Sequence, residues 1–111
     1  MTIREAAKAL DAEILHDEFT DAAISGAYTS DLLSDVMANA RESGALITIQ
    51  AHKNTVAVAT LVNVNVIIIC NSRPIPNDML ASAKEEGIAI LLSKENQFTV
   101  SGKLYALLNK Y

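Results

Sequence analysis

The fold is decided by three apolar runs, Ala45-Leu-Ile-Thr-Ile-Gln50, Val66-Ile-Ile-Ile-Cys70 and Ile88-Ala-Ile-Leu-Leu92. Their first residues are 21 and then 22 positions apart. Each run is short, contains β-branched residues and does not alternate with polar ones, which is typical of a strand covered on both faces. The spacing therefore predicts parallel strands joined by right-handed crossovers, in the order β-α-β-α-β.

The two crossovers differ in how clearly they indicate a helix. In residues 77–86, Met79, Leu80 and Ala83 lie on one helical face, Asn77 is placed to cap the start, and Gly87 follows as a C-cap. Thr55-Val-Ala-Val-Ala-Thr-Leu-Val62 is ambiguous, because its valines favour a strand. Its position between two buried strands favours a crossover helix, and we predict a helix.

Residues 1–44 are expected to add two helices and two weaker strands. Thr2 and Glu5 form a capping box for a helix that runs to about Leu10. Strands are expected over 12–16 and 22–28. A second helix is expected to start with a cap from Thr29, Ser30 or Asp31 and to end at Gly44 in a left-handed C-cap. Its apolar stripe would consist of Leu32, Leu33, Val36, Met37 and Ala40.

The C-terminal segment predicts a last helix from about Asn96. Its inward residues would be Phe98, Leu104, Tyr105 and Leu108. No low-complexity linker divides the chain, and half of its 111 residues are hydrophobic, which is enough for one core. We therefore expect residues 1–111 to form a single α/β domain, with a mainly parallel β-sheet and helices on both faces.

Composition excludes several classes of function. The net charge of −4 disfavours nucleic acid, which attracts clustered basic residues. The apolar runs are strand-length, so no membrane span is expected. Met1-Thr-Ile-Arg-Glu5 is charged and no apolar segment of a signal peptide follows it, and Cys70 is the single cysteine. These features fit a cytoplasmic protein without disulfides.

No catalytic motif is complete. Gly102-Lys103 resembles part of a P-loop, but Gln97 stands where an earlier glycine is needed and Leu104 where Ser or Thr is needed. His16, His52 and Cys70 lack metal-ligand spacing, so no metal site is expected. A nucleophilic Cys70 would need a base such as His52. We expect no enzyme activity and no cofactor.

Polar loops follow each of the three buried strands. In a parallel sheet these loops meet at the carboxyl edge, where helix N-termini carry a partial positive charge. Their small polar and basic groups suit an anionic ligand such as a nucleotide; the alternative is that they only cap helices and solvate loops. The predicted ligand-binding residues are His52, Lys53, Asn54, Thr55, Asn71, Ser72, Arg73 and Lys94.

Three segments resemble the DRTGG domain family: Tyr28-Thr-Ser-Asp-Leu-Leu-Ser-Asp35, Asn71-Ser-Arg-Pro74 and Ala83-Lys-Glu-Glu-Gly-Ile-Ala89. The resemblance extends from about Ile3 to Leu108. It implies a fold like the N-terminal domains of HPr kinase/phosphorylase and of Mur ligases, and the family includes domains found beside CBS domains. This chain has Ala51-His52-Lys53 where the family tends to have Gly-Asp-Arg, and Asn71-Ser72 where it tends to have Gly-Gly.

The resemblance implies regulation and not phosphorylation, since the kinase activity of the HPr enzyme resides in a separate P-loop domain. Our first hypothesis is a non-catalytic regulatory module that senses a small anionic ligand or transmits state to a partner. The second is a structural or interaction module that acts by homodimerisation or by docking to a partner protein. The surface in that case would be the segment from Tyr28 to Asp35 or an edge strand.

Overall fold

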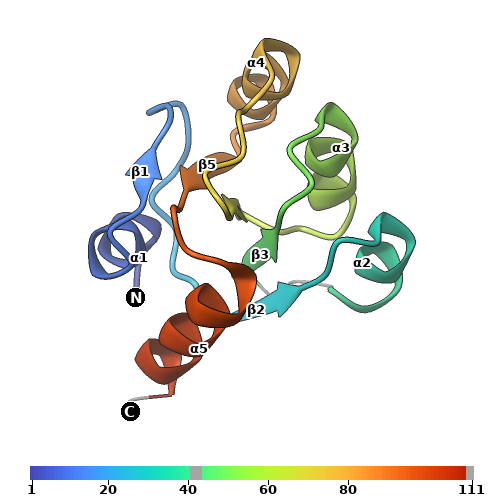
Figure 1. Ribbon diagram of the computed structural model, residues 1–111. Coiled ribbons are helices and arrows are strands. Elements are labelled where there is room, and N and C mark those ends of the chain that lie inside the picture. The colour runs from blue at the N-terminus through green and yellow to red at the C-terminus, as the bar shows by residue number, and fades with distance from the viewer. Residues whose placement is uncertain (41–43, 110–111) are drawn as a thin grey trace.

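The computed structural model describes residues 1–40 and 44–109, which form one α/β layered domain (Figure 1). Five strands make one sheet in the order β1-β5-β4-β3-β2. Strands β2, β3, β4 and β5 are parallel, and β1 joins β5 antiparallel at one edge. The strands are β1 (Glu13–Ile14), β2 (Gly26–Thr29), β3 (Gly44–Thr48), β4 (Val66–Ile69) and β5 (Ala89–Leu92).

In the part of the chain that the structure describes, five helices cover the two faces of this sheet. The helices are α1 (Ile3–Ala9), α2 (Leu33–Asn39), α3 (Lys53–Leu61), α4 (Asn77–Glu86) and α5 (Gln97–Leu108). Helices α1 and α5 lie on one face, and α2, α3 and α4 lie on the other (Figure 1). The predicted fold class is confirmed, including a helix at the ambiguous valine-rich crossover.

The central strands are almost entirely apolar because both of their faces are buried, and the one polar side chain among them, Thr48 at the end of β3, is hydrogen-bonded to Asp31. In β4, Ile68 packs under α1 and α5, whereas Ile67 and Ile69 pack under α3 and α4. All three isoleucines are fully buried. This explains why the runs did not alternate with polar residues, and it makes the middle of the sheet a rigid support for the loops at its ends.

Four local predictions were wrong, three at helix boundaries and one at the bounds of a strand. Helix α2 starts after Leu32 without a side-chain cap, because Asp31 is used elsewhere in the fold. It ends at Asn39, and Gly44 instead opens β3 with a φ of +94°. The strand expected over 22–28 occupies Gly26–Thr29. Pro76, and not Asn77, is the N-cap of α4, whereas Gly87 is the predicted left-handed C-cap.

Four residues predicted to face the core lie largely in solvent. Leu32 is 65% exposed and Met37 48% exposed, so only part of the α2 stripe is buried. On α5, Phe98 is 87% and Tyr105 70% exposed, and the core is filled instead by Val100 and Leu104. Helical periodicity predicted a wider apolar face than the sheet covers.

Candidate functional site

The loops after β3, β4 and β5 meet at the carboxyl edge of the sheet, as predicted, and backbone hydrogen bonds join them. The N–H of Cys70 donates to the carbonyl of Thr48 at 3.0 Å, and the N–H of Ser93 donates to Ile69 at 2.8 Å. Farther out, the N–H groups of Asn71 and Ser72 donate to Glu95 and Ser93, each at 2.9 Å. The three loops are therefore held together by their backbones, and the polar side chains project from this common support.

The first predicted group, at the start of α3, is partly used to build the turn. The Nδ1 of His52 accepts from the N–H of Asn54 at 3.1 Å, which makes His52 the N-cap. The hydroxyl of Thr55 donates to the carbonyl of Gln50 at 2.8 Å, and this side chain is buried. For His52 and Thr55 the structure therefore supports the capping role that sequence left as the alternative.

The second group, after β4, has an unusual backbone. Asn71 and Ser72 have φ of 61° and 50°, in the left-handed region that non-glycine residues rarely adopt. Both side chains and that of Arg73 are exposed. Glycine adopts such dihedral angles without steric cost, so the Gly-Gly pair that the resemblance implies for this position would fit the same turn.

Three cations at this edge have no carboxylate partner among residues 1–40 and 44–109. They are Lys53 at the start of α3, Arg73 after β4 and Lys94 after β5, and all three are exposed. The start of α4 also has no side-chain cap, so its first N–H groups face outward unpaired by side chains. Exposed cations and a helix N-terminus at one edge favour negative charge there.

Asp31 organises the same edge, and sequence reasoning missed it. Its Oδ1 accepts from the hydroxyl of Thr48 at 2.9 Å, from the N–H of Ile49 at 2.9 Å and from the Nε2 of Gln97 at 2.7 Å. The Nε2 of Gln50 donates to its carbonyl. Asp31 thus ties the loop after β2 to the end of β3 and to the start of α5. In the sequence, Asp31 lies between an expected strand and an expected helix, and this position indicated only that it could cap the helix.

Glu95 supplies an acceptor at this edge. Its Oε1 pairs with the Nζ of Lys103 at 2.8 Å. Its Oε2 is buried and has no hydrogen-bond partner in the part of the chain that the structure describes. Because Asn71 bonds to its carbonyl, the backbone of Glu95 belongs to the loops of the predicted site, whereas its carboxylate is held toward α5 by Lys103.

Cys70 is a poor nucleophile. It is fully buried at the end of β4, and burial, followed by the negative charge of Asp31, raises the pKa of its thiol to about 11. Only the thiolate reacts, so this environment disfavours catalysis by Cys70 with His52 as the base. Among the described residues, no group of three or more His, Cys, Asp and Glu is placed to hold a metal ion.

We expect Cys70 to resist alkylation in the folded protein. At pH 8 a thiol with this pKa is roughly one part in a thousand thiolate, and burial also blocks the reagent. Iodoacetamide followed by mass spectrometry should show almost no adduct in native protein and complete labelling in guanidinium chloride. Rapid native labelling would show that the thiol is exposed and activated.

The motif from Tyr28 to Asp35 has a structural role. The hydroxyl of Tyr28 donates to both carboxylate oxygens of Asp35, at 2.9 and 2.8 Å, and the amide of Asn39 donates to Oδ1. Hydrogen bonds from Ser30, Tyr28 and Asn39 lower the pKa of Asp35, and the same carboxylate raises the pKa of Tyr28. This network fixes α2 against β2.

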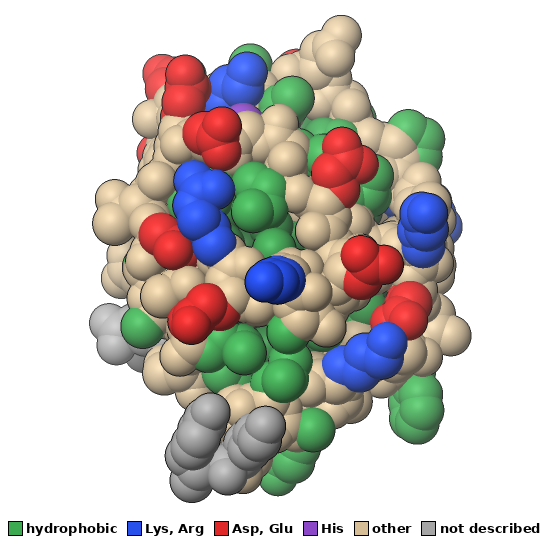
Figure 2. Space-filling model, turned by 90° about the vertical axis from the view of Figure 1, so that its left-hand side faces the viewer, with side chains coloured by type: hydrophobic (Ala, Val, Ile, Leu, Met, Phe, Trp, Pro, Cys, Tyr) green, Lys and Arg blue, Asp and Glu red, His purple; other side chains and the backbone are tan. Residues whose placement is uncertain are grey.

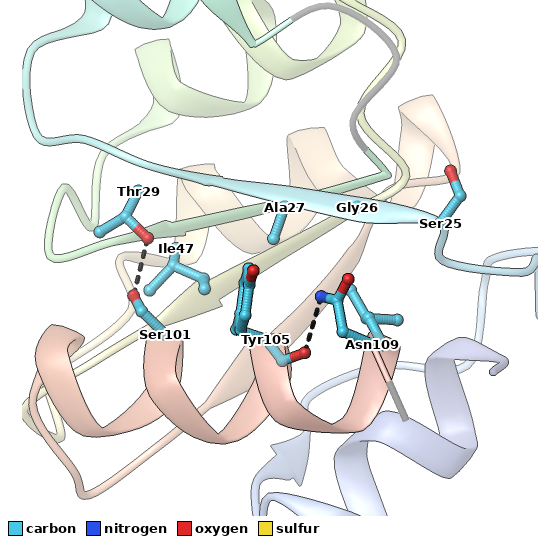
Figure 3. A pocket seen from close by; sticks show the side chains of 9 residues that line it. Ser25, Gly26, Ala27, Thr29, Ile47, Ser101, Tyr105 and Asn109 are labelled. Carbon is cyan, nitrogen blue, oxygen red and sulfur yellow. Dashed lines mark hydrogen bonds between the residues drawn. The ribbon is translucent and has the colours of Figure 1, made fainter. Parts of the chain in front are cut away.

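Two pockets lie away from the predicted site. One, of about 320 Å³, lies between the edge strand β2 and α5. Figure 3 shows Tyr105 and Asn109 of α5 below Ala27 and Gly26, and the hydrogen bond that joins Thr29 to Ser101. The other, of about 150 Å³, lies at the amino edge beside Asn63, Asn65 and Gly87. None of the eight predicted residues lines either pocket.

The surface formed by α1, β1 and α5 carries mixed charge. Figure 2 shows acidic and basic side chains interspersed there, with hydrophobic side chains between them. No extended field of one sign covers this face, so it offers no footprint for a polyanion. Within residues 1–40 and 44–109, moreover, every helix is too short or too polar to cross a membrane.

Comparison with known proteins confirms the resemblance drawn from the three motifs. The family model described as the DRTGG domain matches residues 5–107. No curated protein matches the sequence. A similar solved structure contains the CBS and DRTGG domains of the regulatory region of Clostridium perfringens pyrophosphatase, complexed with its activator diadenosine tetraphosphate. Its TM-score is 0.73 at 14% identity, over 93% of this chain and 45% of that one. This chain thus spans less than half of that structure, and the likeness shows a shared fold.

Proposed function

The chain belongs to the DRTGG domain family, and from this premise we propose that it is a non-catalytic regulatory module that senses a small anionic ligand. The observation that carries the proposal is the set of three exposed cations, Lys53, Arg73 and Lys94, at one sheet edge without carboxylate partners among the described residues. Ligands of open α/β sheets bind beyond the carboxyl ends of the strands.

A nucleotide suits this edge better than a simple anion. The cations and the uncapped start of α4 would receive phosphate groups. The exposed side chains of Asn71 and Ser72 beside Arg73 can donate to or accept from the hydroxyl and amino groups of a nucleoside. The similar pyrophosphatase region was solved with a dinucleoside polyphosphate, which supports testing this ligand class first.

The test is a thermal-shift screen with nucleotides and dinucleoside polyphosphates, including diadenosine tetraphosphate. A ligand at 100 times its dissociation constant should stabilise the fold by about 2.7 kcal/mol, which is roughly 10 °C for a domain of this size. Arg73→Ala and Lys53→Ala should each reduce the shift. Lys84→Ala, at the opposite end of α4, is the matched control and should leave it unchanged. A flat screen at millimolar concentration would refute ligand sensing.

We propose an interaction module as the second candidate function. It is favoured by the exposure of Leu32, Phe98 and Tyr105, large apolar side chains that a monomer would leave in water. On this account the chain regulates by binding a second copy or another protein, with no ligand response. Sedimentation of the free chain, together with the nucleotide screen, separates the two candidates.

A further inference from the structure

The two edges of the sheet are protected to different degrees. Strand β1 is only two residues long and includes the exposed Glu13, two features that discourage pairing with another chain. Strand β2 is last in the sheet order on the other side, and within residues 1–40 and 44–109 the one strand that it pairs with is β3. Its residues, Gly26 to Thr29, include neither a charge nor a proline. Strand β2 is therefore open to further strand pairing.

Helix α5, beside this edge, has an outer face that is poor in charge. Its one charged residue is Lys103, which is paired with Glu95. Phe98 and Tyr105 lie seven positions apart, on the same side of the helix, and both are mostly exposed. By contrast, α4 carries Asp78, Lys84, Glu85 and Glu86. The outer face of α5 has the composition of a surface that another protein covers.

The pocket of about 320 Å³ lies between these two features. It is lined by small or uncharged residues, among them Gly26, Ala27, Ser101 and Leu108, and Tyr105 stands at its side (Figure 3). None of its lining residues is charged. An edge strand, an apolar helix face and an uncharged hollow thus form one continuous surface.

We propose that this surface binds a second copy of the chain, with β2 pairing antiparallel to the partner's β2 across a two-fold axis. The inference rests on the second candidate function and names its partner. A two-fold axis places this surface of one copy against the same surface of the other copy. Because the surface carries no unpaired charge, the two copies do not repel each other there. The same surface offers no charged side chain with which a charged partner could form an ion pair.

Strand pairing explains features that a small ligand would not. The free main-chain groups of β2 would bond along the strand to the partner's β2. The two α5 helices lie on the same face of the extended sheet and become neighbours across the axis. Antiparallel neighbours bring the partner's Phe98 toward the Leu108 end of the pocket, so each chain supplies an aromatic side chain and a hollow that receives it.

The test is sedimentation of the full chain over micromolar to millimolar concentrations. The wild-type chain should be a dimer. Ala27→Lys, which sets like charges across the axis, and the double variant Phe98→Ser/Tyr105→Ser should each raise the dissociation constant by at least about tenfold. Circular dichroism would verify that both variants stay folded. The matched control is Leu61→Ser, because Leu61 is 72% exposed on α3, on the other face of the sheet.

Each outcome decides the proposal. A dimer weakened by the β2 and α5 variants and unchanged by Leu61→Ser supports it. A dimer that only Leu61→Ser dissolves overturns this surface while leaving an interaction function in place. A monomer at every concentration overturns the homodimer altogether, whereas ligand sensing is judged separately by the thermal-shift screen.

Discussion

Replacing Asp31 by alanine should lower the free energy of unfolding by about 3 kcal/mol, because it removes a carboxylate that accepts three hydrogen bonds. The hydroxyl of Thr48, on a fully buried side chain, and the N–H of Ile49 would both lose their acceptor. Each unsatisfied donor costs about 1–3 kcal/mol where water cannot replace the partner. The loop after β2 and the start of α5 would also lose their common anchor.

Urea unfolding of two further variants separates the causes. Asp31→Asn keeps an acceptor oxygen but not the charge, and we expect roughly half the loss. Asp17→Ala is the matched control, because the side chain of Asp17 is 85% exposed and its ion pair with Arg4 is a surface one. Its effect should stay within about 0.5 kcal/mol. An Asp31→Ala variant as stable as wild type would show that the network contributes nothing.

Replacing Gly44 by alanine should cost roughly 2 to 3 kcal/mol, through two separate effects. Its φ of +94° lies where a side chain is strained. An added Cβ would also lie 3.3 Å from the carbonyl oxygen of Gly26 and 3.4 Å from Ile24. Gly26 and Gly44 are partners in the β2–β3 ladder, so the close backbone cannot withdraw without separating the edge strand.

Two other glycines make this prediction specific. Gly87→Ala keeps a positive φ of 70° but meets no neighbouring atom, so it isolates the backbone strain, at about 1 kcal/mol. Gly102→Ala lies inside α5 in open space with an ordinary φ and should stabilise the protein by about 1 kcal/mol. In thermal unfolding at one protein concentration, Gly44→Ala should have the lowest melting temperature, Gly87→Ala a smaller decrease and Gly102→Ala an increase relative to wild type. If Gly44→Ala were no less stable than Gly87→Ala, the close approach of Gly44 to Gly26 would contribute nothing to the cost of an added side chain.

The sheet was predictable because β3, β4 and β5 are covered on both faces, so their residues are almost all apolar and do not alternate with polar ones. Their near-constant spacing then required crossover helices, which settled the valine-rich segment from Thr55 to Val62. The positions of the polar loops followed from strand direction alone. The family was also recognisable from short motifs, and the match over residues 5–107 confirms it.

Contacts between residues far apart in the sequence could not be predicted. Gln97 is 66 residues from Asp31, and nothing local indicates that they meet. Similarly, the helical period of α5 placed Phe98 and Tyr105 on the core side, but the face that the sheet covers runs through Val100 and Leu104. How wide a face is covered depends on where the helix sits over the sheet, which periodicity does not encode.

The regulatory account is tested most directly by titrating ¹⁵N-labelled protein with diadenosine tetraphosphate and with single nucleotides, while amide chemical shifts are followed. The account predicts saturable shifts that cluster at Lys53, Asn54, Asn71, Ser72, Arg73 and Lys94. Spectra that remain unchanged at millimolar ligand, or shifts confined to β2 and α5, would contradict ligand sensing at the carboxyl edge.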